Sequence, residues 1–130
     1  MIAHACIIVG NYESGKAFYE AALAPLGYKL TMDHPEWKAG GYNDGKNTDF
    51  WISQKEGVTT GFQSHVAFEA KSQAEVEAFY DAALQAGGKD NGAPGYRKEY
   101  WPGYYAAFVH DADGNNVEAV WFDYSQVTTS

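Results

Sequence analysis

The first half of the chain is repeated in the second half, displaced by 61 residues. Eight of the 24 residues from His4 to Gly27 are identical to those from His65 to Gly88, without a gap. Ordinary composition would give roughly one or two identities by chance. A repeat of this length is one supersecondary unit used twice. Each copy begins with a histidine, so His4 and His65 occupy equivalent positions in two similar folding units.

Each copy reads as a strand followed by a helix. Residues 2–9 and 65–70 alternate so that one face is apolar and the other carries the histidine. This is typical of a strand that packs on helices with one face only. Asn11 and Ser72 are good helix N-caps, and Ser72 begins a capping-box pattern. Apolar stripes at helical spacing follow both caps, and glycines mark the expected helix ends: Gly27 and Gly87-Gly88.

Three shorter strands complete each copy and give two tandem βαβββ modules, an α+β fold. They are expected near 28–33, 37–43 and 48–53 in the first copy, and near 88–91, 103–110 and 116–122 in the second. Residues 92–102, rich in glycine, proline and aromatics, read as a loop. The chain is predicted to be one domain over 1–130, divided into module 1 (1–53), a linker (54–63) and module 2 (64–123).

The second half of the repeat carries a turn followed by a carboxylate. Asp44-Gly45 and Asp113-Gly114 are tight-turn signals, and each is followed by the pattern x-Asn-x-acid. Aligned on these turns, with a small insertion, Asp49 matches Glu118. Each copy is therefore expected to present a histidine and, after a turn, a carboxylate.

These residues are suitable ligands for a divalent metal. Imidazole and carboxylate together suit Fe, Mn, Ni, Co or Zn. Two histidines and one carboxylate, His4, His65 and Glu118, would leave positions open for substrate or water. Asp49 is a fourth candidate, and because its side chain is one methylene shorter it is expected to reach the metal through a bridging water. Glu118 lies in an apolar strand, where burying it without a partner would be costly.

Composition limits the class of partner. The net charge of −8 argues against nucleic acid or anionic lipid. No apolar stretch is long enough to span a membrane.

The sequence has a single cysteine, Cys6, which excludes an internal disulfide and suits a reducing cytoplasm. We expect Cys6 to be a small buried side chain. His34 and His110 have no repeat partner and read as surface or hydrogen-bonded residues.

The chain resembles the vicinal oxygen chelate superfamily, which includes glyoxalase I, extradiol dioxygenases, and fosfomycin- and bleomycin-resistance proteins. The resemblance covers essentially the whole chain. It rests on His4, on Ala17-Phe18-Tyr19 with Leu26-Gly27-Tyr28, on His65-Val66-Ala67-Phe68, and on the run from Asp111 to Glu118. Asp49-Phe50-Trp51 and Pro102-Gly103-Tyr104-Tyr105 are similar to stretches of small glyoxalase-like proteins.

The resemblance implies a curled mixed sheet, or cup, that surrounds one divalent metal and has the helices on its outer face. His4, His65 and Glu118 match the family's metal positions. At the remaining position glyoxalase I typically has Glu or His, whereas this chain offers Asp49. A homodimer is implied, because two cups are often built from modules shared or abutted across subunits.

Three functions follow from these observations. The first is a lyase, isomerase or dioxygenase that acts on a small oxygen-chelating substrate through the metal, with Glu118 or Asp49 as proton acceptor. The second is a metal-free protein that sequesters a small molecule, and the third binds a metal without turnover.

The candidate substrate-binding residues are Arg97, Tyr100, Tyr104 and Tyr105. Either Tyr104 or Tyr105 is expected to face the site, since neighbouring strand residues point to opposite faces.

Overall fold

The computed structural model describes residues 2–55 and 64–127, and most of the expected linker therefore lies outside the described residues. Module 1 consists of β1 (Ala5–Val9), α1 (Tyr12–Leu23), a 3₁₀ turn η1 (Ala24–Leu26), β2 (Lys29–His34), β3 (Ala39–Asn43) and β4 (Thr48–Gln54). Module 2 consists of β5 (His65–Glu69), α2 (Gln73–Gln85), β6 (Lys89–Tyr96), β7 (Tyr104–His110), β8 (Asn116–Phe122) and η2 (Tyr124–Gln126). This order confirms the two predicted βαβββ modules.

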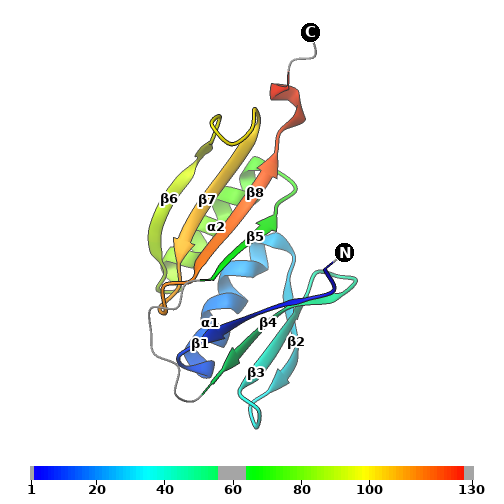
Figure 1. Ribbon diagram of the computed structural model, residues 1–130, viewed down its shortest axis with the longest axis vertical. Coiled ribbons are helices and arrows are strands. Elements are labelled where there is room, and N and C mark those ends of the chain that lie inside the picture. The colour runs from blue at the N-terminus through cyan, green and yellow to red at the C-terminus, as the bar shows by residue number, and fades with distance from the viewer. Residues whose placement is uncertain (1, 56–63, 128–130) are drawn as a thin grey trace.

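Each module forms its own four-stranded mixed sheet. The strand orders are β1-β4-β3-β2 and β5-β8-β7-β6, and in each sheet only the first pair is parallel. Figure 1 shows the sheets as two blocks along the long axis of the molecule. A single curled cup around a metal, as the resemblance implied, is not seen among the described residues of one chain.

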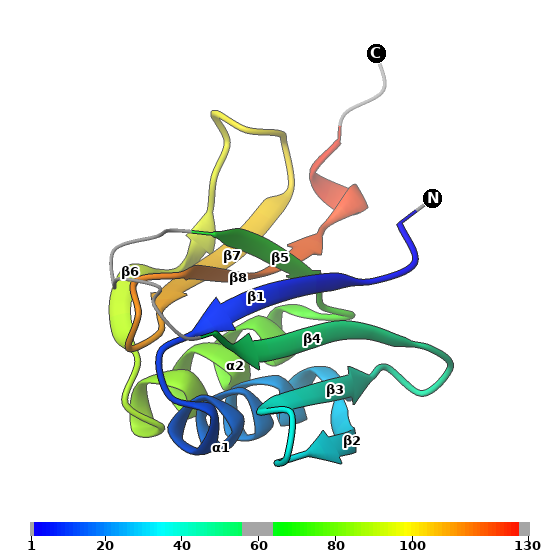
Figure 2. The same ribbon diagram turned by 60° about the horizontal axis from the view of Figure 1, so that its bottom comes forward.

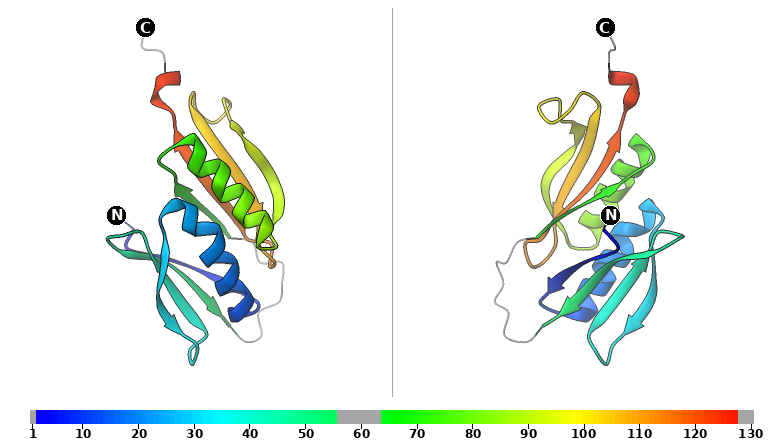
Figure 3. Two further views of the ribbon diagram at one scale, coloured as in Figure 1. Left: turned by 180° about the vertical axis from the view of Figure 1, so that it is seen from behind. Right: turned by 45° about the vertical axis from the view of Figure 1, so that its right-hand side comes forward.

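Both helices lie on the same side of the molecule and pack against each other (Figures 2 and 3). The apolar faces of both sheets meet them there, and one core cluster runs through both modules. Its most buried large side chains come from both halves: Tyr19, Leu23, Tyr42, Phe50 and Ile52 from the first, and Val76, Phe79, Val109 and Val117 from the second. The two modules are therefore stabilised by a shared core.

The helix ends follow the predicted caps. The Asn11 side chain accepts a hydrogen bond from the Ser14 amide at 2.9 Å, and Ser72 accepts one from Glu75 at 3.2 Å. Gly27 and Gly87 end the helical segments at φ of +85° and +102°, a left-handed conformation that favours glycine. The capping box is modified, because the Glu75 carboxylate accepts from the amide of Lys71, one residue before the cap.

The predicted loop over 92–102 is wrong at its start, because β6 continues to Tyr96. β6 is an edge strand, so Pro94 removes no hydrogen bond from a second neighbour. Two register irregularities, at Asp90/Gly92 and Gly92/Gly95, interrupt its pairing with β7. Glycine and proline thus mark bulges in a continuous strand here, where the sequence suggested a loop.

Strand pairing also corrects the alignment of the second half of the repeat. Ala5 pairs with Phe50 in module 1, and Val66 pairs with Val117 in module 2. Since Ala5 and Val66 are equivalent in the repeat, Phe50 is equivalent to Val117. The antiparallel neighbours agree, because β3 pairs with β4 and β7 pairs with β8 in registers that match at the same offset.

The corrected register makes Asp49 the counterpart of Asn116, whereas Trp51 is the counterpart of Glu118. The shift of two residues keeps each side chain on its expected face. It arises because Asp44-Gly45 opens the module 1 turn, while the module 2 turn opens at Asp111, two residues before its Asp-Gly step. Alignment on the Asp-Gly steps therefore matched different positions of two turns.

The turn from Asp111 to Asn115 fastens the two modules together. Tyr19 of α1 donates its hydroxyl hydrogen to the Asp111 carboxylate at 2.6 Å, and the Asn115 side-chain amide donates to the Ile8 carbonyl at 3.1 Å. Asp111 also accepts from the amides of Asp113 and Asn115 and is 5% exposed. The same buried carboxylate therefore shapes the turn and anchors it to module 1.

Cys6 is exposed, so its expected burial is wrong. Cys6 lies in the edge strand β1, on the histidine-bearing face, and the helices do not cover this face.

Across residues 2–55 and 64–127, no helix has the length and apolar character needed to cross a membrane.

Replacing Asp111 should destabilise the whole fold. Asp111→Ala leaves the buried Tyr19 hydroxyl and turn amides without an acceptor, and we expect a loss of about 3 kcal/mol in the free energy of unfolding, measured by urea denaturation. The matched control is Asp44→Ala, since Asp44 opens the equivalent turn but is exposed and bonds only local amides. It should lose about 1 kcal/mol or less. Equal losses in the two variants would show that Asp111 does not join the modules.

Candidate functional site

Glu118 is a buried carboxylate at the centre of β8. Its neighbours Val117 and Ala119 point into the helix-side core, so Glu118 points to the opposite face of the sheet. It is nevertheless only 1% exposed. A carboxylate removed from water requires hydrogen-bonding or charged partners, because its desolvation is otherwise very costly.

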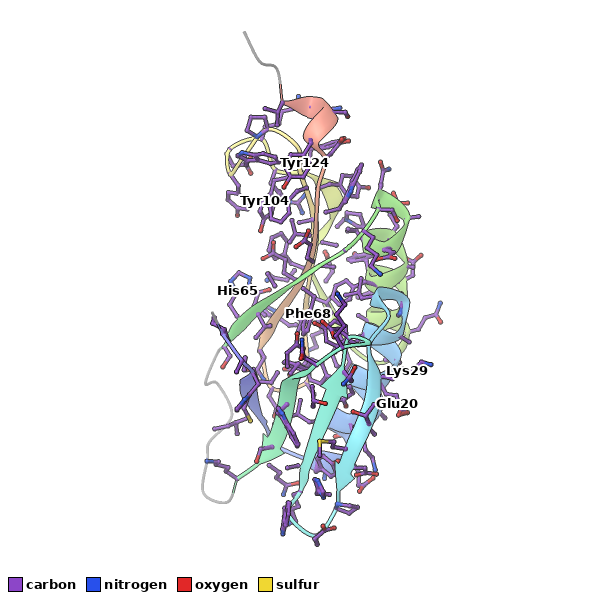
Figure 4. The ribbon with its side chains drawn as sticks, turned by 90° about the vertical axis from the view of Figure 1, so that its right-hand side faces the viewer. Glu20, Lys29, His65, Phe68, Tyr104 and Tyr124 are labelled. Carbon is purple, nitrogen blue, oxygen red and sulfur yellow. The ribbon has the colours of Figure 1, made fainter. Side chains whose placement is uncertain are left out.

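Two side chains supply those partners. The His65 Nε2 atom lies 2.7 Å from one Glu118 oxygen, and the Tyr104 hydroxyl donates to the other. In the parallel pairing Ala67 is opposite Glu118, so His65 reaches it diagonally from two residues away. Figure 4 shows His65 and Tyr104 on the side of the molecule opposite the helices. The His65 side chain remains 53% exposed.

The sequence left open whether Tyr104 or Tyr105 faces the site, and the structure decides between them. Tyr104, Ala106 and Phe108 lie on the Glu118 face, where they cluster with Val120 and Phe122. Burial, followed by the hydrogen bond to Glu118, raises the pKa of Tyr104 above its ordinary value. Tyr104 therefore stays protonated at neutral pH and acts as a hydrogen-bond donor.

Tyr105 lies on the helix side of β7. Its hydroxyl donates to Glu77 of α2 at 2.8 Å, and its ring packs on Tyr96 and Trp121. Burial raises the pKa of Tyr105 to about 12. The structure therefore places Tyr104 beside Glu118 and Tyr105 on the other face of the sheet.

A pocket of about 490 Å³ opens in front of this group. Tyr100 lies at its edge, 62% exposed, with its ring edge-to-face on Tyr104. Arg97 lies on the β6 side of the same pocket. The lining combines polar and aromatic side chains: His65, Asn91, Arg97, Tyr100, Tyr104, Phe108, Asn116 and Glu118, with Gly92. Three of the four predicted substrate-binding residues thus share one pocket with His65 and Glu118.

Sequence reasoning missed Asn116. It lines the pocket two residues before Glu118, on the same face of β8, and its Oδ1 atom is buried without a hydrogen-bond partner. Its counterpart in module 1, Asp49, likewise has a buried oxygen without a partner. The alternation of side chains along a strand could have revealed Asn116, because every second residue counted from Glu118 points to the same face of β8.

Neither His4 nor Asp49 joins His65 and Glu118 in one ligand group among the described residues. His4 is exposed and precedes β1. Asp49 accepts a hydrogen bond from the Tyr28 hydroxyl at 3.3 Å, and burial raises the pKa of Asp49. It lines a second pocket of about 390 Å³ with Tyr28 and side chains of β1, β4 and β5, and His65 borders both this pocket and the Glu118 pocket. Within the described residues, no three His, Cys, Asp or Glu side chains form a group that could hold a metal.

His65 and Glu118 nevertheless fit part of a metal site. Their 2.7 Å separation is close to the roughly 3 Å between neighbouring ligands on an octahedral ion with bonds of about 2.1 Å. A nitrogen and a carboxylate oxygen are suitable donors for the first-row metals. The pair supplies two ligands and therefore needs at least one more. Trp51, the module 1 counterpart of Glu118, cannot supply it; its ring stacks parallel to His34 at 6.4 Å.

Removing the Tyr104 hydroxyl should destabilise the protein through Glu118. In Tyr104→Phe the buried carboxylate keeps only His65, and we expect a loss of about 2 kcal/mol in unfolding free energy. Tyr100→Phe is the matched control, since that hydroxyl is exposed and makes no contact with Glu118; its loss should stay below about 0.5 kcal/mol. Chemical denaturation of both variants measures the difference, and indistinguishable stabilities would contradict the contact.

Comparison with solved structures supports this architecture. The chain is 27% identical to a glyoxalase/bleomycin resistance protein from Albidiferax ferrireducens T118, covering 92% of this chain and 97% of that one, with a TM-score of 0.78. A putative glyoxalase from Bacillus halodurans is 24% identical, with coverage of 93% and 95% and a TM-score of 0.69. Fosfomycin resistance protein FosX from Mesorhizobium loti shares the fold at 15% identity and a TM-score of 0.66, with coverage of 96% and 94%.

No curated protein is similar enough in sequence to count as a match. Residues 1–119, which include every candidate site residue, match the sequence profile of the Glyoxalase/Bleomycin resistance protein/Dioxygenase superfamily. With both βαβββ modules present, the chain belongs to this superfamily as a small glyoxalase-like protein.

Proposed function

We propose that the protein is a metalloenzyme that acts on a small oxygen-bearing molecule through one divalent metal, Fe, Mn, Ni, Co or Zn. The observation that carries the proposal is the buried Glu118 beside His65 at the back of a pocket large enough for a small molecule. His4, His65 and Glu118 would hold the metal. This set of two histidines and one carboxylate leaves coordination positions open.

The bound metal would supply a Lewis acid for substrate oxygens, as in lyase, isomerase or dioxygenase chemistry. Glu118 is the candidate proton acceptor, and Tyr104 holds its second oxygen in place. Tyr100, Tyr104 and Arg97 line the space in which a substrate would bind. We assign no ligand role to Asp49, because its alignment with Glu118 no longer holds and it contacts Tyr28.

We further propose that the protein is a homodimer in which one chain supplies His4 to the His65–Glu118 pair of the other. Two observations support it: His4 is not gathered with this pair, and the module 1 face that carries Trp51 is not covered by helices. Trp37 on this module is 68% exposed, an unusual exposure for so large an apolar ring. The predicted cup would then form between chains.

A metal-free binding protein is the second candidate. One observation favours it: His65 and Glu118 already satisfy each other at 2.7 Å, so the buried carboxylate does not require a metal. Metal content separates this candidate from the first, and turnover separates an enzyme from a metal-bound protein without activity.

Purified without chelator, the protein should contain about one metal per chain by elemental analysis. His65→Ala and Glu118→Gln should each lose most of it. His34→Ala is the matched control, because the His34 ring packs near Trp37 and Trp51 and does not line the Glu118 pocket. Metal content that is the same in all four proteins would exclude the assigned ligands.

Light scattering at micromolar concentration should give twice the chain mass of 14.3 kDa. A mixing experiment then tests the shared site. His4→Ala and Glu118→Gln should each fail to bind metal alone, but a mixed dimer would hold one intact site, restoring about a quarter of the wild-type content in a random mixture. No recovery on mixing would place all ligands of a site in one chain, and a monomer mass would contradict the dimer itself.

A further inference from the structure

Arg97 is the only arginine in the sequence, and it lines the same pocket as His65 and Glu118. Its two terminal nitrogens donate to backbone carbonyls of β6, Nη1 to Gly95 at 2.9 Å and Nη2 to Ala93 at 2.8 Å. The guanidinium also lies over the Phe108 ring, with Cζ 5.4 Å from the ring centroid. Backbone and ring therefore hold this cation in a fixed position.

The β6 backbone is irregular where it passes the Arg97 guanidinium. Gly92 lies at φ +150°, and a Cβ atom there would be 3.1 Å from Nη2 of Arg97 and 2.9 Å from the Phe108 ring. A Cβ at Gly95 would be 3.1 Å from Nη1. Both glycines flank the register irregularities of β6. Glycine at these two positions therefore leaves room for the guanidinium, which a larger residue would crowd.

Among the described residues, the Arg97 guanidinium is not paired with a carboxylate. No carboxylate within residues 2–55 and 64–127 forms an ion pair with it. Three carboxylates of module 2 bond to other side chains: Asp90 to Tyr80, Asp123 to Tyr96, and Glu118 to His65. An unpaired guanidinium is unexpected in a chain with a net charge of −8, where carboxylates are abundant.

The geometry points to Arg97 as the recognition group for an oxyanion, so that the small molecule taken by this pocket carries a carboxylate, phosphonate or phosphate group. A guanidinium has five N–H donors, of which β6 occupies two. The others suit an oxyanion. Repulsion from Glu118 would turn the uncharged end of the ligand toward His65. This inference rests on the proposed function only in taking the Glu118 pocket as the substrate site.

The test is a titration of the full chain followed by ¹H–¹⁵N NMR, with two pairs of probes of similar shape. Acetate is compared with acetamide, and methylphosphonate with dimethyl sulfone. At least one anion should bind with a Kd on the order of millimolar, about tenfold or more tighter than its neutral analogue. Which anion binds distinguishes a planar carboxylate from a tetrahedral group. In Arg97→Gln the preference for the anion should disappear, and in Arg97→Lys it should be intermediate.

Lys98→Gln is the matched control, because Lys98 is the adjacent cation but lines a different pocket; it should keep the wild-type preference. Since the chain has one arginine, its single side-chain Nε–H signal should move with the anion, which tests the contact even if Arg97→Gln does not fold. Binding of neither anion, or equal preference in wild type and Arg97→Gln, would overturn the inference. Metal content of Arg97→Gln should equal wild type, so loss of anion binding and failure of the metal assignment are separate results.

Discussion

Glu118 is held away from water in the middle of a strand that is covered on both faces. On one face, Val117 and Ala119 belong to the core shared with the helices, so the strand cannot turn to expose the carboxylate without opening that core. On the other face, desolvation of the carboxylate must be offset locally. His65 and Tyr104 do so from the two strands that flank β8, and their positions follow from this requirement. The geometry of the pocket thus derives from the packing of β8.

The turn before β8 links this site to the rest of the fold. Asp111 closes the hairpin that delivers Asn116 and Glu118, and the same carboxylate binds Tyr19 in module 1. Module 1 and the candidate site are therefore connected through one buried hydrogen-bonded turn. The equivalent turn of module 1, opened by Asp44, is exposed, and among the described residues the Asp44 carboxylate accepts hydrogen bonds from the amides of Lys46 and Asn47 within the same turn. Two copies of one sequence pattern have therefore acquired different structural roles.

Two groups of opposite charge, Glu118 and Arg97, line the pocket. Glu118 is hydrogen-bonded by His65 and Tyr104, whereas Arg97 is fixed by backbone carbonyls of β6 and forms no ion pair among the described residues. A polar pocket of this kind is more selective than an apolar one, because a ligand that leaves a buried charge or donor unpaired binds poorly. Membership of the superfamily supplies the scaffold, and such local differences decide which molecule each member takes.

The sequence alone determined the two βαβββ modules, the helix caps at Asn11 and Ser72, and the face on which His65 and Glu118 lie, because these depend on local periodicity and hydrogen bonding. It did not determine strand register. Alignment on Asp-Gly steps equated Asp49 with Glu118, and only the pairing of β1 with β4 and β5 with β8 showed that Asn116 is the counterpart of Asp49. The course of β6 around Arg97 and the choice between Tyr104 and Tyr105 were likewise decided by tertiary structure. Each depends on contacts between segments far apart in the chain, which period-two patterns cannot specify.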